Sequence, residues 1–264
     1  MQDSLQTIIE TVRNYKGLLR KRPIKEIYEK LGMTAQYGNQ LVNYGEDTAV
    51  IPWRDGYLLL AADGMMTQLL VNEPYAAGKA SVMVTVNDIY AMGGKPIGMV
   101  NVMASGDDEQ RAKIVDGIAN GCRKLKVPML GRHVHPDAAV DCPALSVAIL
   151  GQAENLLRSH LAQSGDELVL AVDLSGQAGC HTVLSWDANS GKTAEELLFR
   201  LAALPTIADR KLSQAAKDVS NAGILGTTSI MLENSAKGGL IDLERIPRPD
   251  GLALKDWLLS FQKE

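Results

Sequence analysis

The segment over residues 78–103 (GKASVMVTVNDIYAMGGKPIGMVNVM) constrains the fold most, because it places a carboxylate inside an otherwise apolar stretch. Small and aliphatic residues recur at helical spacing over 79–92, which predicts a largely buried helix. Two glycines then end the helix, and Pro96 prevents its continuation. Residues 97–103 follow as an apolar run of strand length. The segment therefore predicts a helix, a tight turn and a strand, with Asp88 inside the core.

Asp88 needs a partner wherever the helix buries it. An ionised carboxylate in apolar surroundings requires a cation or several hydrogen-bond donors. Two interpretations stay open at this point. Either Asp88 and Asn87 satisfy a neighbouring stretch of backbone, or Asp88 belongs to a site that binds a cation.

Length and composition indicate two cores of moderate size. The chain has 264 residues, of which 46% are hydrophobic, and a polar connector near residue 155 predicts domains over 1–155 and 156–264. The formal net charge of −4 argues against general binding to nucleic acid or acidic membranes, and the short basic cluster over 20–25 is expected to be a solvated turn. No apolar run approaches the ~20 residues of a membrane span. Three separated cysteines without a C-x-x-C pair fit a cytoplasmic protein.

Hydrophobic periodicity and turn residues predict the remaining elements. Helices are expected over 5–19, 109–126, 207–217, from about 222, and after a capping box formed by Thr193 and Glu196. Strands are expected over 57–62, 127–130, 144–150, 167–172 and 240–243. Polar segments over 33–46 and 131–143 are expected to be loops, and the second of these has the composition of a working loop.

Three aspartates, Asp47, Asp63 and Asp88, stand where apolar strands or helices meet glycine-rich turns. Convergent carboxylates without nearby His or Cys suit Mg²⁺, which takes oxygen ligands and keeps its other positions for water and phosphate oxygens. This pattern favours a nucleotide-phosphate site over a zinc site. The alternative is that the three are ordinary loop residues that follow strands.

The segment after residue 130 carries further candidates. His133 and His135 alternate and can share a face, but only Cys142 stands nearby as a third soft ligand, so zinc and iron are disfavoured. Arg132 offers a two-pronged donor for phosphate, with an ordinary surface ion pair as the alternative. The P-loop, the dinucleotide-binding glycine pattern and the G-x-S-x-G nucleophile turn are all absent from the sequence.

Several strings resemble the PurM-like superfamily, which includes aminoimidazole ribonucleotide synthase, thiamine-monophosphate kinase and selenophosphate synthetase. In chain order they are GEDTAVI (45–51), ADG (62–64), VNDIYAMGGKP (86–96), GRH (131–133) and DVSNAG (218–223), so the resemblance covers most of the chain. The strings HVHPD, DVSNAGILGT and IDLERIPRP are most similar to the AIR synthase-related subgroup, which includes the methanogenesis marker 2 proteins.

The resemblance implies an α+β fold with α/β layers. Each protomer would have two domains, the N-terminal sheet would form a barrel across a homodimer, and the C-terminal α+β domain would be shortened relative to the family. ATP and Mg²⁺ would bind near the dimer interface, with a small molecule as the second substrate. The acceptor pocket would come from second-domain loops such as 173–189.

The motif positions also imply roles for individual residues. Asp47, Asp63 and Asp88 would be the carboxylates that hold magnesium and the phosphates. Asp218 would be the aspartate that the second domain contributes to catalysis, together with Asp88. The residues expected to line the phosphates are Asn87, Gly131, Arg132 and His133.

The resemblance thus implies an ATP- and Mg²⁺-dependent phosphoryl-transfer enzyme of the kinase or synthase type, which activates an oxygen of a small substrate. This agrees with the carboxylates, because phosphoryl transfer needs charge neutralisation and alignment more than a covalent catalyst. The alternative is a dimeric nucleotide-binding module with weak turnover, acting as a partner or regulator. Arg132, which stands where the family has a glycine, and the short C-terminus favour that alternative. Ala222 also stands where the family often has a glycine. A purely structural dimer is the third interpretation.

Overall fold

The computed structural model describes residues 4–19, 21–31, 45–105, 107–135, 137–220 and 223–263. The predicted loop over 33–46 therefore lies mostly outside the described residues, as do Arg20 of the basic cluster and Ala222. None of the helices in the described ranges is both long enough and apolar enough to cross a membrane.

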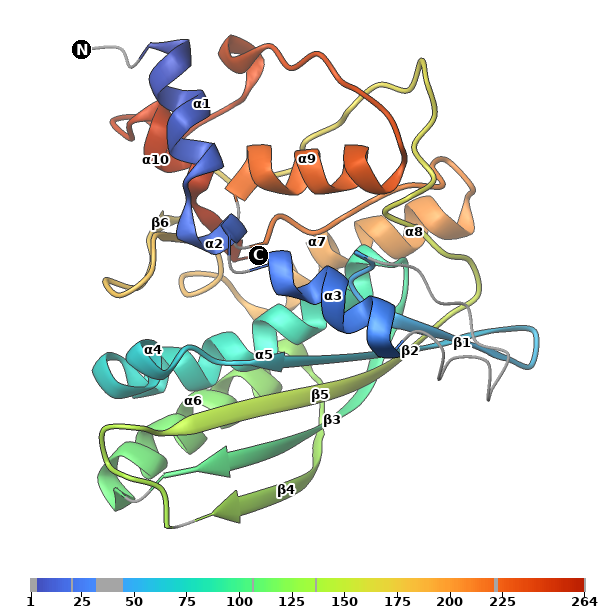
Figure 1. The fold of residues 1–264 in the computed structure, drawn as a ribbon. Helices are drawn as coiled ribbons and strands as arrows, with labels where there is room; N and C mark the ends of the chain where they lie inside the picture. Colours follow the sequence, from blue (N-terminus) through green and yellow to red (C-terminus); the bar gives the residue numbers. More distant parts are fainter. Residues whose placement is uncertain are drawn as a thin grey trace.

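A five-stranded mixed sheet forms the centre of the first half of the chain (Figure 1). Its strand order is β1-β2-β5-β3-β4. The strands are β1 (Ala49–Trp53), β2 (Gly56–Gly64), β3 (Lys95–Ala104), β4 (Met129–His135) and β5 (Ala144–Ala153). Within this five-stranded sheet, β3 and β4 are the one parallel pair among the described strands. The helix α6 (Asp108–Leu125) connects them along the chain. Parallel neighbours need such a crossover, which explains why a helix separates these two strands.

Two long helices cover one face of this sheet, namely α6 and α5 (Pro74–Ala91), which follows the short helix α4 (Thr67–Asn72) (Figure 1). Side chains on all sides of α5 are buried. Its glycine Gly78 lies against the backbone of α6, where a side chain would collide with the carbonyl oxygen of Ile114. The helix closes at Gly93, whose φ of +81° suits a residue without a side chain. The predicted buried helix is thus confirmed, and Pro74 at its first turn explains its earlier start.

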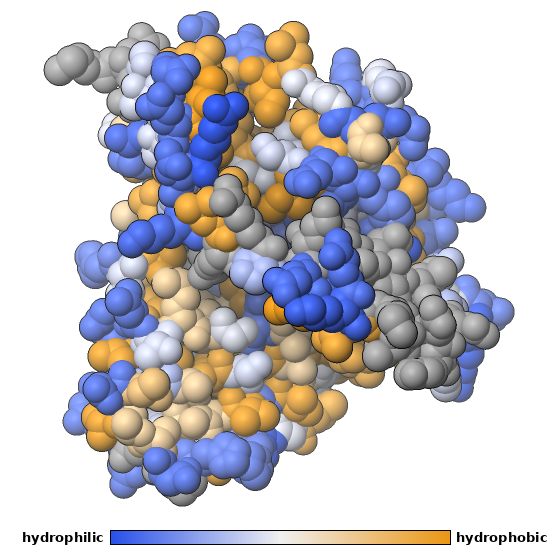
Figure 2. Space-filling model, in the orientation of Figure 1, coloured by the Kyte–Doolittle hydropathy of each residue, from blue (hydrophilic) through white to orange (hydrophobic). Residues whose placement is uncertain are grey.

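The opposite face of the sheet is open and apolar. Along β3, Met99 and Asn101 are buried under the helices, whereas Val100 and Val102 are 47% and 48% exposed. Leu60 on β2 is 45% exposed on the same side. Figure 2 shows this apolar surface over the strands. Exposed apolar residues gathered on one sheet face are typical of surfaces that bind a partner or a ligand.

The second half of the chain packs around a separate cluster at Trp186 and Trp257, whose rings meet edge to face with centroids 5.5 Å apart. It contains a small sheet of β6 (Gln177–Ala178), β7 (Ser185–Asp187) and β8 (Phe261–Lys263). Its helices are α7 (Ala194–Leu201), α8 (Ala203–Asp209), α9 (Gly223–Asn234), α10 (Leu254–Leu259) and the 3₁₀ helix η2 (Leu243–Arg245). The predicted mixture of helices and sheet layers is therefore confirmed. The barrel across a homodimer and the domain boundary at residue 155 stay predictions.

The structure also corrects several predicted elements. The helix over 5–19 is divided into α1 (Leu5–Arg13) and α2 (Lys16–Leu19), because the chain leaves the helix at Asn14, a residue with low helix propensity; α3 (Arg22–Leu31) follows. The loop predicted over 131–143 is wrong at its start. Residues 131–135 belong to β4, a strand at the sheet edge where polar side chains stay exposed.

Two predicted strands and most of a predicted helix are absent from the described chain. Residues 167–172 form no strand, because their apolar pattern reflects the packing of Leu170 and Val172 against the tryptophan cluster. The strand predicted over 240–243 is wrong: these residues form no strand, and Leu240 is fully exposed. The helix predicted over 207–217 ends at Asp209, and the irregular chain that follows carries the residues that matter most below.

Candidate functional site

Three aspartates from distant parts of the chain converge on one point. Asp47 lies just before β1, Asp88 lies in the last turn of α5, and Asp218 lies in the irregular chain after α8. One carboxylate oxygen of each lies within 4.8 Å of the others. We call Asp47, Asp88 and Asp218 the carboxylate cluster. Asp88 lies near the carboxyl end of α5, where the negative end of the helix dipole disfavours a negative charge.

Residues of the second half hold Asp47 in place. The neighbouring Glu46 has a buried side chain that pairs with Arg158 at 3.3 Å and with His160 at 2.5 Å. The carbonyl oxygen of Gly45 accepts a hydrogen bond of 3.2 Å from the Ser159 hydroxyl. The sequence did not predict these contacts, because nothing in the local pattern links residues more than a hundred positions apart.

A lysine that the sequence analysis did not identify lies inside the cluster. The Lys217 ammonium pairs with Asp47 Oδ1 and lies 3.8 Å from Asp218 Oδ1. Its side chain is only 7% exposed. Burial lowers the pKa of Lys217, but the carboxylates of Asp47 and Asp218 raise it more, so the ammonium stays charged. The overlooked sequence signal is a basic residue, Lys217, that follows two alanines and directly precedes Asp218.

One lysine does not neutralise the carboxylates. Burial, together with the charges of Asp218, Asp47 and Asp63, raises the pKa of Asp88 well above the usual range. Burial and the charge of Asp47 raise the pKa of Asp218 to about 7. Both shifts mean that the site lacks positive charge when it holds no other cation.

Neighbouring polar atoms fit a hydrated metal ion. Asn87 is buried, and its Oδ1 has no hydrogen-bond partner among the described residues. The same holds in the described ranges for Oγ1 of the buried Thr48, next to Asp47. Buried polar atoms are normally satisfied, so these two are candidate hydrogen-bond partners for water or a ligand. Oxygen donors of this kind, without His or Cys, suit Mg²⁺.

Asp63 lies beside the cluster and not in it. Its position on β2 follows the buried Leu59 and Ala61, so its side chain points to the helix-covered face of the sheet. From there it raises the pKa of Asp88, but it does not share the close oxygen contacts of the three clustered aspartates. Asp63 is also exposed, so it can contribute charge at the edge of the site.

The residues predicted to line the phosphates are divided between two places. Asn87 is next to Asp88, whereas Gly131, Arg132 and His133 lie on the edge strand β4. The register places Arg132 in one row with Asn101, Val147 and Asp63. Three strand spacings, roughly 14 Å, therefore separate Arg132 from Asp63 within one chain. The structure does not bring these three β4 residues to the cluster of their own chain.

His133 and His135 do share a face, as their alternation predicted. Their rings meet edge to face with centroids 4.5 Å apart. His133 pairs with the exposed Val102 in the sheet register, so the two histidines lie on the open apolar face of the sheet.

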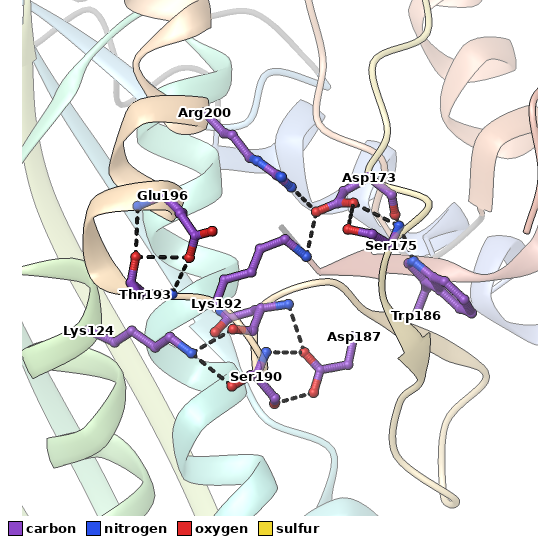
Figure 3. Close-up of polar contacts among 11 residues, drawn as sticks. Lys124, Asp173, Ser175, Trp186, Asp187, Ser190, Lys192, Thr193, Glu196 and Arg200 are labelled. Carbon is purple, nitrogen blue, oxygen red and sulfur yellow. Dashed lines mark hydrogen bonds and ion pairs between the residues drawn. The ribbon is translucent and has the colours of Figure 1, made fainter.

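A second polar network joins the two halves at the other end of α5 (Figure 3). Asp173 accepts ion pairs from Lys192, at 2.7 Å, and from Arg200. Lys124 on α6 donates to the carbonyl oxygen of Asn189 at 2.5 Å. We call this set, with Asp187 and Ser190, the paired network.

A cavity of about 210 Å³ lies beside the paired network, lined by α5 residues such as Lys79 and by loop residues such as Asp187. It involves the loop expected to form the acceptor pocket. Lys79 and Asp88 are nine residues apart on α5, which corresponds to roughly 13 Å along the helix. A small acceptor in this cavity would therefore lie too far from the carboxylate cluster for direct transfer.

Comparison with known proteins identifies the family. Residues 45–153 match the family described as AIR synthase related protein, N-terminal domain. An uncharacterised protein of Synechocystis sp. is 39% identical over 258 residues, covering 97% of this chain and 79% of that protein. The chain belongs to the AIR synthase-related family. A further uncharacterised member, from Methanocaldococcus jannaschii, is 39% identical over 263 residues, covering 98% of this chain and 81% of that protein.

Solved structures place this AIR synthase-related protein in the PurM-like fold. AaThiL complexed with AMPPCP and TMP has a TM-score of 0.64 and 18% identity, and the match covers 89% of this chain and 82% of AaThiL. PurL of T. maritima complexed with ADP has a TM-score of 0.65 and 16% identity, covering 90% of this chain and 44% of PurL. The match to the AIR synthase-related family confirms the superfamily predicted from the motifs, and these solved structures confirm the fold.

Proposed function

We propose that the protein is an ATP- and Mg²⁺-dependent phosphoryl-transfer enzyme of the kinase or synthase type, which activates an oxygen of a small substrate. The observation that carries this proposal is the convergence of Asp47, Asp88 and Asp218 within 4.8 Å. The nucleotide ligands of AaThiL and T. maritima PurL, AMPPCP and ADP, support the choice of ATP.

The chemistry of the site agrees with this function. Asp47, Asp88 and Asp218 would hold magnesium, whose positive charge neutralises phosphate oxygens during transfer. Asn87 Oδ1 can accept a hydrogen bond from water on the ion, which would orient that water. Asp63, at the edge of the cluster, adds negative charge that favours a divalent cation over a monovalent one.

A turnover assay tests the proposal. The protein is incubated with ATP and Mg²⁺, with and without mixtures of small hydroxyl- and carboxyl-bearing acceptors, and ADP release is followed. Asp218→Asn should abolish release, because it removes one carboxylate of the cluster. Asp108→Asn is the matched control, since its side chain is 91% exposed on α6 and pairs with Arg111 at the surface. ATP binding without ADP release under any condition would instead favour a nucleotide-binding module.

We also propose a homodimer formed through the open face of the five-stranded sheet. The exposed Val100, Val102 and Leu60 support this assembly, because a second copy would bury their apolar surface. A barrel made from two such sheets would place His133 at the interface. Three separated cysteines without a C-x-x-C pair fit the reducing cytoplasm that we propose as its location.

Light scattering after size exclusion tests the assembly. The wild-type protein should elute as a dimer, and Val102→Glu should elute as a monomer, because it places a charge in the apolar interface. Val115→Glu is the control, since this valine is 46% exposed on α6, away from the open face. A wild-type monomer at micromolar concentration would contradict the dimer.

A further inference from the structure

Lys217 occupies the place where the carboxylate cluster would hold a metal ion. Its ammonium contacts Asp47 Oδ1 and lies 3.8 Å from Asp218 Oδ1, and one carboxylate oxygen of each of these aspartates lies within 4.8 Å of the other and of an Asp88 oxygen. Oxygens that share one magnesium ion lie about 2.1 Å from it, hence at most about 4.2 Å from one another. A magnesium ion bound through Asp47 Oδ1 would therefore compete with the ammonium for that oxygen, and Lys217 would have to leave it.

We propose that Lys217 is a tethered cation that holds the carboxylate cluster together until magnesium displaces it, and that the displaced ammonium then contacts the nucleotide phosphates. This inference rests on the proposed function. Both the displacement and the new phosphate contact follow from the ion pair between Lys217 and Asp47. The ammonium that leaves the cluster keeps its positive charge, and the chain keeps it next to the site.

The charges of the cluster favour such an exchange over a permanent ion pair. When all three carboxylates are ionised, one magnesium ion and one lysine together balance them, whereas either cation alone leaves negative charge at a buried site. A lysine that stayed in the cluster would compete with the metal, and one that moves outward adds a positive charge where phosphate binds. Lys217 has a flexible four-carbon stem and lies in irregular chain, so this movement needs no helix or strand to break.

The backbone links the exchange to the position of Asp218. The Asp218 amide lies 3.4 Å from Asp47 Oδ2 and donates a hydrogen bond to it, so residues 217 and 218 both dock on Asp47. When the lysine leaves, this backbone contact can keep Asp218 at the cluster as a metal ligand.

The test compares wild type with Lys217→Met and measures thermal unfolding and Mn²⁺ binding by electron paramagnetic resonance, with Mn²⁺ as the magnesium probe. Without divalent ions, Lys217→Met should unfold at a lower temperature, because its carboxylates lose their only described buried ammonium partner, and millimolar Mg²⁺ should restore most of that loss. Removal of a competing cation should tighten Mn²⁺ binding about tenfold. ATP binding in saturating Mg²⁺ should weaken about tenfold, since the displaced ammonium is missing.

Metal and nucleotide affinities that move in opposite directions separate this account from a structural role, which would weaken both. Lys113→Met, at a half-exposed lysine of α6, is the control and should change neither affinity. Lys217→Gln, which keeps a donor and loses the charge, serves if the methionine variant does not fold. Equal Mn²⁺ affinity in wild type and variant would overturn this inference alone. No Mn²⁺ binding to any of these proteins would overturn the proposed function as well.

Discussion

The two ends of helix α5 use charged groups in opposite ways. In the paired network, Asp187 accepts hydrogen bonds from the backbone of Asn189 and from Ser190. Burial raises the pKa of Asp187, but these hydrogen bonds and the charge of Lys79 lower it more, so it lies below its usual value. In the carboxylate cluster, burial and neighbouring charges raise the pKa of Asp88 instead.

This difference distinguishes carboxylates that stabilise the fold from carboxylates that need a bound cation. A carboxylate with its own donors stabilises the fold by its charge, whereas carboxylates that share one lysine destabilise the fold until a further cation binds. Replacement of a carboxylate by the neutral amide should therefore have opposite effects at the two ends of α5.

The largest effect on stability is expected at Asp173 of the paired network. Its side chain is 10% exposed and pairs with both Lys192 and Arg200. Asp173→Asn leaves two cations without their carboxylate and should lower the free energy of unfolding by about 3 kcal/mol. Urea unfolding followed by circular dichroism measures this change. An unchanged midpoint would show that the two networks do not differ in the way described.

A smaller change of opposite sign is expected at the cluster. Without divalent ions, Asp88→Asn should raise the free energy of unfolding by about 1 kcal/mol, because it removes a buried and undercompensated charge. The gain should disappear when millimolar Mg²⁺ stabilises only the wild-type protein. The same urea titrations, with and without Mg²⁺, provide the measurement, and a loss of stability in metal-free Asp88→Asn would contradict the comparison.

The smallest effect on stability is expected at the start of α7, where Glu196 stabilises a single helix end. Thr193 and Glu196 form the predicted capping box at the start of α7, with Glu196 accepting from the Thr193 amide at 2.7 Å. Thr193→Ala should cost about 0.5 kcal/mol of stability and leave nucleotide binding unchanged. Thermal unfolding and a nucleotide titration check both parts. A change in nucleotide affinity would mean that the start of α7 influences the nucleotide site.

The sequence predicted the parts of the site that lie in regular elements. The buried helix with Asp88 and the strand that carries Asp63 follow from apolar runs bounded by glycines. The convergence of Asp218 with Asp47 was implied by the family motifs and not by spacing, because irregular chain positions Asp218 and periodicity carries no information there.

The remaining contacts could not be predicted because they depend on tertiary packing. The position of Lys217 follows from the docking of residues 217 and 218 on Asp47, which no local pattern encodes. Residues 131–135 looked like a loop because their side chains are polar, yet pairing with β3 makes them an edge strand. The apolar residues over 167–172 looked like a strand because burial against the tryptophan cluster produces the same pattern.

The most direct test of the central claim is a calorimetric titration of ATP into wild type, Asp88→Asn and Asp173→Asn, each with and without Mg²⁺. We predict Mg²⁺-dependent binding to wild type and to Asp173→Asn, measured at a temperature where both are folded, and loss of that binding in Asp88→Asn. Equal, Mg²⁺-independent binding to all three proteins would contradict a metal-nucleotide site at the carboxylate cluster.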